Sequence, residues 1–150
     1  MYVVQNGKAN DAGKPWYPTF RGAVSLVKSG TNTLALAGVS TTTGRLEVAE
    51  GRIEFTGDGS WAQAGEVAVS GGTLALDRRG RIGLVDLTVG GGTVEVAAGV
   101  RQRVKSLKVL DGEVWRNVNP GRYCAERLPD VVSGGGSIVV INAGTRIIVR

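Results

Sequence analysis

A ten-residue pattern recurs four times in the middle of the chain, and this repeat limits the possible folds more than any other feature. The four copies begin at Leu46, Val67, Leu87 and Leu107, so successive copies start 21, 20 and 20 residues apart. Each copy reads apolar-x-apolar, then a short turn, then apolar-x-apolar. Strict alternation of this kind predicts a β-strand with one buried face on either side of the turn.

Aligning the four copies gives four columns of alternating positions. Fifteen of their sixteen residues are apolar, against 42% of the whole chain, and the exception is Arg116. A fifth column, at the turn, is always glycine, which indicates a bend that needs either a positive φ or a close approach of two backbone segments. The columns are Leu46/Val67/Leu87/Leu107, Val48/Val69/Val89/Val109, Ile53/Leu74/Val94/Val114, Phe55/Leu76/Val96/Arg116 and Gly51/Gly72/Gly92/Gly112.

This repetition predicts an all-β fold, a right-handed parallel β-solenoid (β-helix) with about 20 residues per rung and capped ends. Each rung of a solenoid stacks on the next, so the same class of side chain recurs at the same position. A β-sandwich also has short alternating strands and glycine turns, but it does not require one residue class at one phase in four successive units. The outward positions vary freely, as expected of a solvated surface: Glu47/Ala68/Thr88/Lys108 and Glu54/Ala75/Glu95/Trp115.

Two further sets of residues extend the pattern. Residues 24–26, 29–30 and 34–36 have the same layout with a longer turn, which predicts an earlier turn of the coil. Between the copies, residues 60–62, 81–83 and 101–103 lie 21 and 20 residues apart, and we interpret them as a third, weaker side of the coil.

The single expected domain, residues 1–150, needs closed ends, because exposed strand edges invite association. Arg116 falls in an inward column, where an unpaired charge is costly, so the regular stack is expected to end near that rung. Residues 118–122 are predicted to be a turn or loop, and residues 131–132, 137–140 and 146–149 to be strands. The expected parts are 1–22 (an N-terminal cap or the remnant of a longer coil), 23–116 (regular rungs) and 117–150 (a C-terminal cap).

Residues 28–38 read Lys-Ser-Gly-Thr-Asn-Thr-Leu-Ala-Leu-Ala-Gly, and residues 43–53 read Thr-Gly-Arg-Leu-Glu-Val-Ala-Glu-Gly-Arg-Ile. This stretch resembles the autotransporter-associated β-strand repeat, which has a Lys-x-Gly-x-x-x-Leu-x-Leu strand, a Thr/Gly-rich turn, a second strand and Gly-Gly-Thr-Leu. Residues 71–74 and 91–94 look like its second half, so the resemblance covers roughly residues 23–96. The tail, residues 121–140, looks like the end of secreted bacterial β-helix chains of this kind.

The resemblance implies a β-helical passenger domain of a secreted or surface-exposed bacterial protein, and it implies no particular activity. The first residues do not form a signal peptide, since no charged region precedes a long apolar one. The chain is therefore either cytoplasmic or an excised piece of a secreted chain, and we favour the second. No apolar run approaches the roughly 20 residues of a transmembrane helix, so no transmembrane segment is expected.

The composition argues against several kinds of active site. The chain has no His, which excludes Ser-His-Asp and Cys-His catalytic groups and His-containing metal sites. Its one cysteine, Cys124, cannot form an internal disulfide. Pectin-cleaving β-helices cluster Asp, Lys or Arg on one side of the coil, whereas here Asp77 and Asp86 are single residues in separate places on either side of a group of arginines. We therefore expect no catalytic residue, cofactor or metal site.

The basic residues indicate a binding surface more clearly. A net charge of +5 and a pI near 9.8 favour anionic partners. Arg81 and Arg101 lie 20 residues apart and are expected to stack one rung above the other, with Arg79, Arg103 and Lys105 nearby. Such a ladder can bind sulfate or carboxylate groups, whereas the simpler interpretation is a solvated basic face.

Trp115 is outward by phase, so it is either covered by the C-terminal cap or exposed as a platform for a sugar ring. The leading hypothesis is a non-catalytic structural or adhesive module, and the alternative is a carbohydrate-active domain that binds or cleaves an anionic polysaccharide. The expected partners are an acidic polysaccharide and the remainder of a longer parent chain, or a second copy associated through the solenoid ends. Nucleic acid is not favoured, because aromatic residues are not interleaved with the basic ones.

Overall fold

The computed structural model describes residues 2–5 and 21–141, with side chains placed for residues 21–141. All regular structure in this part of the chain is β-strand, so it contains no helix that could cross a membrane. The strands are β1 (Tyr2–Gln5), β2 (Leu26–Ser29), β3 (Thr33–Leu36), β4 (Arg45–Val48), β5 (Arg52–Phe55), β6 (Glu66–Val69), β7 (Thr73–Leu76), β8 (Asp86–Val89), β9 (Thr93–Val96), β10 (Arg101–Val104), β11 (Ser106–Asp111), β12 (Val114–Asn117), β13 (Gly121–Tyr123), β14 (Val132–Ser133) and β15 (Ser137–Val140).

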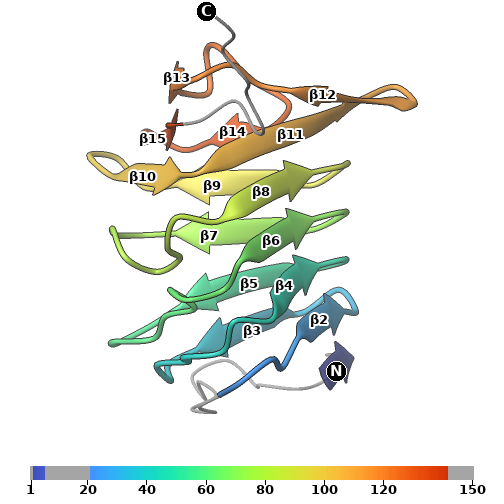
Figure 1. The fold of residues 1–150 in the computed structure, drawn as a ribbon, viewed down its shortest axis with the longest axis vertical. Coiled ribbons are helices and arrows are strands. Elements are labelled where there is room, and N and C mark those ends of the chain that lie inside the picture. The colour runs from blue at the N-terminus through green and yellow to red at the C-terminus, as the bar shows by residue number, and fades with distance from the viewer. Residues whose placement is uncertain (1, 6–20, 142–150) are drawn as a thin grey trace, which may run out of the picture.

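These strands form a right-handed coil of about four turns, with roughly 20 residues in each (Figure 1). A seven-stranded sheet has the order β1-β2-β4-β6-β8-β11-β12, a five-stranded sheet β14-β9-β7-β5-β3 and a three-stranded sheet β10-β15-β13. Neighbouring strands are parallel, except that β12 is antiparallel to β11 and β13 to β15. The predicted right-handed parallel β-solenoid is confirmed.

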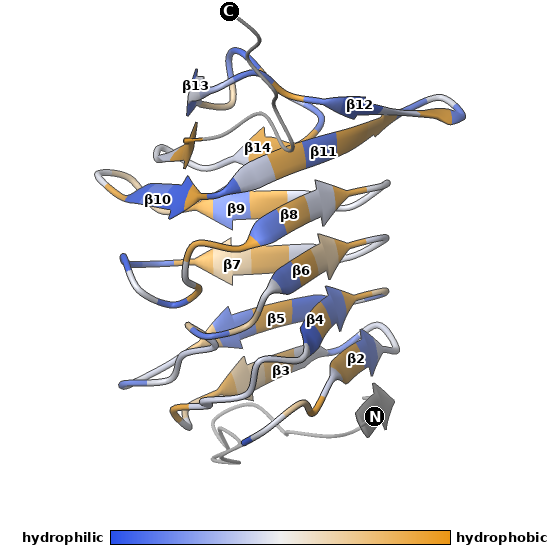
Figure 2. Ribbon diagram, viewed as in Figure 1, coloured by the Kyte–Doolittle hydropathy of each residue, from blue (hydrophilic) through white to orange (hydrophobic). Residues whose placement is uncertain are grey.

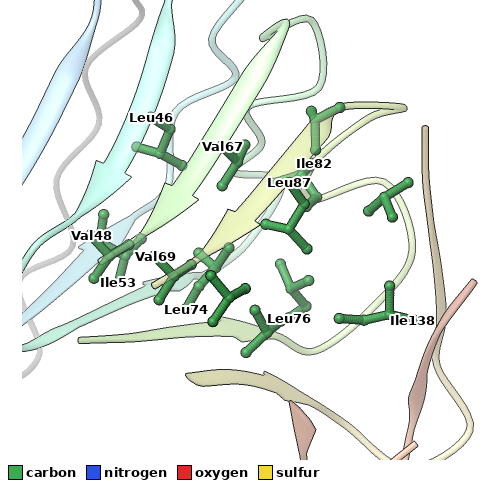
Figure 3. Packing of buried hydrophobic residues seen from close by; sticks show 14 of the residues in the cluster. Leu46, Val48, Ile53, Val67, Val69, Leu74, Leu76, Ile82, Leu87 and Ile138 are labelled. Atoms are coloured by element: carbon green, nitrogen blue, oxygen red, sulfur yellow. The ribbon is translucent and has the colours of Figure 1, made fainter. Parts of the chain in front are cut away.

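The apolar columns stack in register along the coil and form its core. Strand pairing aligns the first residue of each repeat with that of the next, and each of these side chains is at most 1% exposed: Leu46, Val67, Leu87 and Leu107. On the opposite sheet Ile53, Leu74 and Val94 are aligned in the same way and fully buried. Figure 3 shows members of both sets meeting between the two sheets. Each buried side chain of this size contributes roughly 1.5–3 kcal/mol before the entropy of ordering is counted.

The glycine column includes both a residue with a positive φ and a residue in close contact with another backbone segment. Gly51 has a φ of 72°, a conformation that side chains with a Cβ rarely adopt. At Gly92 the constraint is space, because a Cβ there would lie 2.5 Å from the carbonyl oxygen of Gly72 and 2.4 Å from Cγ1 of Val69. Close stacking of successive corners therefore excludes larger residues at this position.

The earlier turn of the coil, formed by β2 and β3, is present but in a different register. Lys28, rather than Val24, occupies an inward column, where it pairs with Val48. Its side chain is fully buried, and its Nζ donates hydrogen bonds to the carbonyl oxygens of Ser29 (2.8 Å) and Gly30 (2.6 Å). Desolvation lowers the pKa of Lys28. The buried Lys28 side chain thus stabilises the corner between β2 and β3 by hydrogen bonds to its backbone.

The third side of the coil is also confirmed. Trp61 forms a parallel bridge with Ile82, and both residues are 1% exposed. Gln102 continues this column, since its Nε2 donates a hydrogen bond of 3.1 Å to the carbonyl oxygen of Ile82. Ile138 of β15 pairs with Gln102 of β10 and extends the column to the C-terminal end.

The fourth repeat departs from the predicted columns. Strand β12 folds back beside β11 instead of crossing to the five-stranded sheet, and Val132 takes the place above Val94. The prediction that Val114 and Arg116 face inward is therefore wrong, because Val114 is 63% exposed and the Arg116 side chain 64% exposed. Folding back keeps the guanidinium charge out of the core, where it would be costly.

The described C-terminal residues continue the coil by two strands, and a third strand pairs beside them in the opposite direction. Strands β14 and β15 stack in parallel on β9 and β10, which confirms the strand predicted at 137–140 and places the strand predicted at 131–132 one residue later, at Val132–Ser133. Strand β13 overlaps the end of the segment predicted as a turn, residues 118–122, and pairs antiparallel with β15. The predicted strand at 146–149 and most of the predicted N-terminal cap lie outside the described residues.

Candidate anion-binding surface

The outer face of β10 carries two arginines, because inward and outward side chains alternate along this strand. Gln102 and Val104 are buried, whereas Arg101 and Arg103 are exposed. The Cα atoms of residues two apart on a strand are separated by roughly 6–7 Å, so the two guanidinium groups emerge side by side. Figure 2 shows most of β10 as hydrophilic, in contrast to the banded strands of the core.

A shallow hollow of about 180 Å³ opens beside this strand. Arg101 and Arg103 line it together with Arg79, which lies in the turn after β7. Ile82 and Leu84 add apolar lining, and Leu84 is 55% exposed. All three arginines are exposed, and none forms an ion pair with a carboxylate of residues 21–141. The structure therefore brings three of the predicted binding residues together.

Arg81 does not join them, and the prediction that it forms an outward ladder with Arg101 is wrong. Its side chain is 3% exposed, and its Nε lies 2.8 Å from Oδ1 of Asp77. Its Nη1 donates hydrogen bonds to the carbonyl oxygens of Gly57 (2.9 Å) and Gly59 (2.7 Å) in the preceding turn of the coil. The hydrogen bond from Arg81 lowers the pKa of Asp77. The guanidinium is held inward because it donates four hydrogen bonds there, two to Asp77 and two to backbone carbonyl oxygens.

The other two predicted residues lie outside the hollow. Lys105 follows β10 directly and is exposed, but it does not line the hollow. Trp115 lies on β12 against the corner between β8 and β9, where a Cβ on Gly90 would be 2.7 Å from its Cη2 atom. Trp115 is 50% exposed, so its indole is not covered by the described part of the C-terminal cap.

Arg122 belongs to the same basic face, although the sequence analysis did not include it. Arg122 pairs with Val139, and Val139 pairs with Arg103, so these three residues share the outer face of the three-stranded sheet. Arg122 also donates a hydrogen bond of 3.1 Å from Nε to Oγ of Ser137. Along β13 Arg122 alternates with the buried Tyr123, so Arg122 faces outward. The repeat pattern does not predict the antiparallel pairing that places β13 beside β15.

A second hollow, of about 480 Å³, lies along the five-stranded sheet. There Arg52 on β5 forms ion pairs with Glu54, at 3.2 Å, and with Glu95 on β9. Partial burial lowers the pKa of Arg52, but hydrogen bonds to Glu95 and Glu54 outweigh it and raise the pKa. Within residues 21–141 no three Cys, Asp or Glu residues gather in a way that would hold a metal ion. The ion pair between Arg52 and Glu95 thus links strands of different rungs.

Comparisons with known proteins assign no relative, since no family model, no curated protein and no solved structure matches the chain. The resemblance to the autotransporter-associated β-strand repeat therefore rests on its sequence motif alone and remains a prediction.

Proposed function

We propose that the chain is a non-catalytic structural or adhesive β-helix module of a secreted or surface-exposed bacterial protein. The observation that carries the proposal is the use of charged side chains as links between rungs. Arg81 binds two carbonyl oxygens of the preceding turn, and Arg52 joins β5 to Glu95 on β9, two rungs away. Hydrogen bonds and ion pairs between rungs restrict the movement of one rung relative to the next.

A stiff coil of this kind presents a continuous outer surface, which is how solenoid proteins bind partners. The basic hollow beside β10 supplies a surface suited to adhesion, because its three arginines have no acidic partner in the described part of the chain. The same hollow favours the second candidate, a carbohydrate-active domain that binds or cleaves an anionic polysaccharide. Either interaction would weaken with salt, since exposed charges are screened over about 8 Å at physiological ionic strength.

One experiment separates the two candidates. The protein is passed over immobilised heparin and pectate at low and moderate salt, and it is also incubated with the soluble polysaccharides, whose chain length is then measured by size-exclusion chromatography. An adhesive module is retained at low salt, is released as salt rises and leaves the chain length unchanged. Shortened chains would establish the second candidate, and absence of both retention and shortening would leave only the structural role.

Paired charge reversals locate the binding surface. The double variant Arg101→Glu plus Arg103→Glu should lose retention, whereas Arg21→Glu plus Lys108→Glu, with the same change in net charge, should keep most of it. All four residues are exposed, and none forms an ion pair within residues 21–141. Equal loss in both double variants would show that retention reflects total charge and not this surface.

A further inference from the structure

The hollow beside β10 combines charge with an apolar lining. Three arginines line it, and Ile82 and Leu84 form part of its wall. Leu84 is among the most exposed large apolar residues of the described chain, at 55%. A site for a bare inorganic anion needs only the arginines. An exposed leucine beside them fits a ligand that carries an apolar surface together with its negative charge.

The size of the hollow limits that ligand. Its volume of about 180 Å³ is below the range of roughly 300–1,000 Å³ that is typical of pockets enclosing drug-sized molecules. The space suits one ring-sized unit, and the rest of a longer ligand would continue over the surface. Single-stranded nucleic acids fit less well, because they bind by stacking their bases on aromatic side chains. No aromatic residue of the described chain lines this hollow, and Trp115 lies elsewhere, against Gly90 at the corner between β8 and β9.

We propose that this hollow binds one acidic sugar unit, a pyranose ring with a carboxylate or sulfate group, within an anionic polysaccharide. The inference rests on the proposed adhesive function and names its ligand. The C–H face of the ring packs against Leu84, and the anionic group lies between Arg101 and Arg103, whose forked guanidinium groups bind planar carboxylates bidentately.

Arg122 extends the site beyond the hollow. It lies two strands from Arg103 across β15, and adjacent strands are about 4.8 Å apart, so their backbones are separated by roughly 10 Å. A second acidic unit of the same polysaccharide therefore meets Arg122 when the first unit fills the hollow. The bound chain crosses β10, β15 and β13 on the outer face of the three-stranded sheet.

Calorimetric titration with matched small ligands tests this assignment: galacturonate, galactose sulfate, neutral galactose, inorganic sulfate, trigalacturonate and a single-stranded DNA oligonucleotide. The two acidic sugars should bind more tightly than inorganic sulfate, and neutral galactose should not bind measurably. Arg103→Gln should weaken galacturonate binding by about tenfold, as expected for the loss of a charge-assisted hydrogen bond. Arg122→Gln should weaken trigalacturonate binding while leaving galacturonate binding unchanged.

Leu84→Asn is the decisive variant, because it removes the exposed part of the apolar wall without changing the charge. It should weaken galacturonate binding several-fold and leave sulfate binding unchanged, with an unaltered melting temperature as the check on folding.

Equal binding of sulfate and galacturonate, together with no effect of Leu84→Asn, would overturn the proposal in favour of a simple anion site. Tighter binding of DNA would overturn it in favour of nucleic acid. Retention on heparin or pectate without sugar binding in the hollow would contradict this inference but leave the adhesive function intact.

Discussion

Residues 87–96 and 107–116 share one pattern, but they fold differently. In the first segment, β8 and β9 belong to two different sheets, and Val94 is fully buried between them. In the second segment, β11 and β12 form an antiparallel hairpin in a single sheet, and Val114, at the equivalent position, is 63% exposed. Alternation therefore fixes which side chains share a face of a strand, but it does not fix the sheet that the strand joins.

The corner and the last column account for the difference. Three glycines, Gly90 to Gly92, separate β8 from β9, whereas two residues separate β11 from β12. The first of these two, Gly112, has a φ of 66°, and two-residue hairpin loops often place a glycine with positive φ there. Crossing to the other sheet would also carry Arg116 into the column of Val96. The hairpin instead leaves Arg116 in solvent, 3.3 Å from Asp111.

Truncating one side chain in each region gives the largest expected contrast. Leu87→Ala should lower the free energy of unfolding by about 2–5 kcal/mol, because it opens a cavity between occupied rungs. Val114→Ala should change it by less than about 0.5 kcal/mol, since this side chain is already largely in solvent. Urea denaturation of both variants measures the two changes.

Thr88→Ala serves as the control for Leu87→Ala, because the neighbouring side chain points to the outer face and should cost little. If Leu87→Ala and Val114→Ala destabilised the protein equally, the hairpin would be wrong and the fourth repeat would cross the coil as the first three do.

Two arginines, both paired with aspartate, give the next contrast. Arg81 lies 2.8 Å from Asp77 with its side chain 3% exposed, and Arg116 lies 3.3 Å from Asp111 with its side chain 64% exposed. Arg81→Ala should cost about 1.5–3 kcal/mol, because it leaves the buried carbonyl group of Gly59 without the Arg81 donor. Arg116→Ala should cost less than about 0.5 kcal/mol, as exposed ion pairs usually do. Similar denaturation midpoints for the two variants would show that Arg81 is not held inside the coil.

The repeat predicted the coil correctly because an apolar column is a local signal that recurs at a fixed period. Polar residues that enter the core carry no such signal. Lys28 and Arg81 read as surface residues, yet each is buried because backbone carbonyl groups at a corner satisfy its donors. Their inward orientation depends on the neighbouring rung, which a periodic pattern does not describe.

The candidate site was likewise predictable only where its residues follow the repeat. Arg101 and Arg103 follow from alternation in β10, and Arg79 from its nearness in sequence to the third side. Arg122 comes to this face through an antiparallel pairing that occurs once in the described chain outside the hairpin, so no period announces it. Leu84 carries no such sequence signal, because its role depends on its exposure beside the hollow.

Acid titration of the Arg81–Asp77 pair gives the smallest expected effect, because the Asp77 side chain is 57% exposed and solvent screens its charge. The hydrogen bond from Arg81 lowers the folded-state pKa of Asp77 below its ordinary value of 3.8. A carboxylate with a lowered folded-state pKa adds stability above its unfolded-state pKa and loses that contribution as pH falls through the folded-state pKa. Asp77→Asn should therefore melt below the wild type near neutral pH, and the gap should close below about pH 4. In the Arg81→Ala background the same substitution should have a much smaller effect on the melting temperature, because the main group that lowers the Asp77 pKa is gone and only its backbone hydrogen bond and the charge of Arg78 still lower it. A gap of undiminished size in that background would assign the effect to contacts of Asp77 other than Arg81.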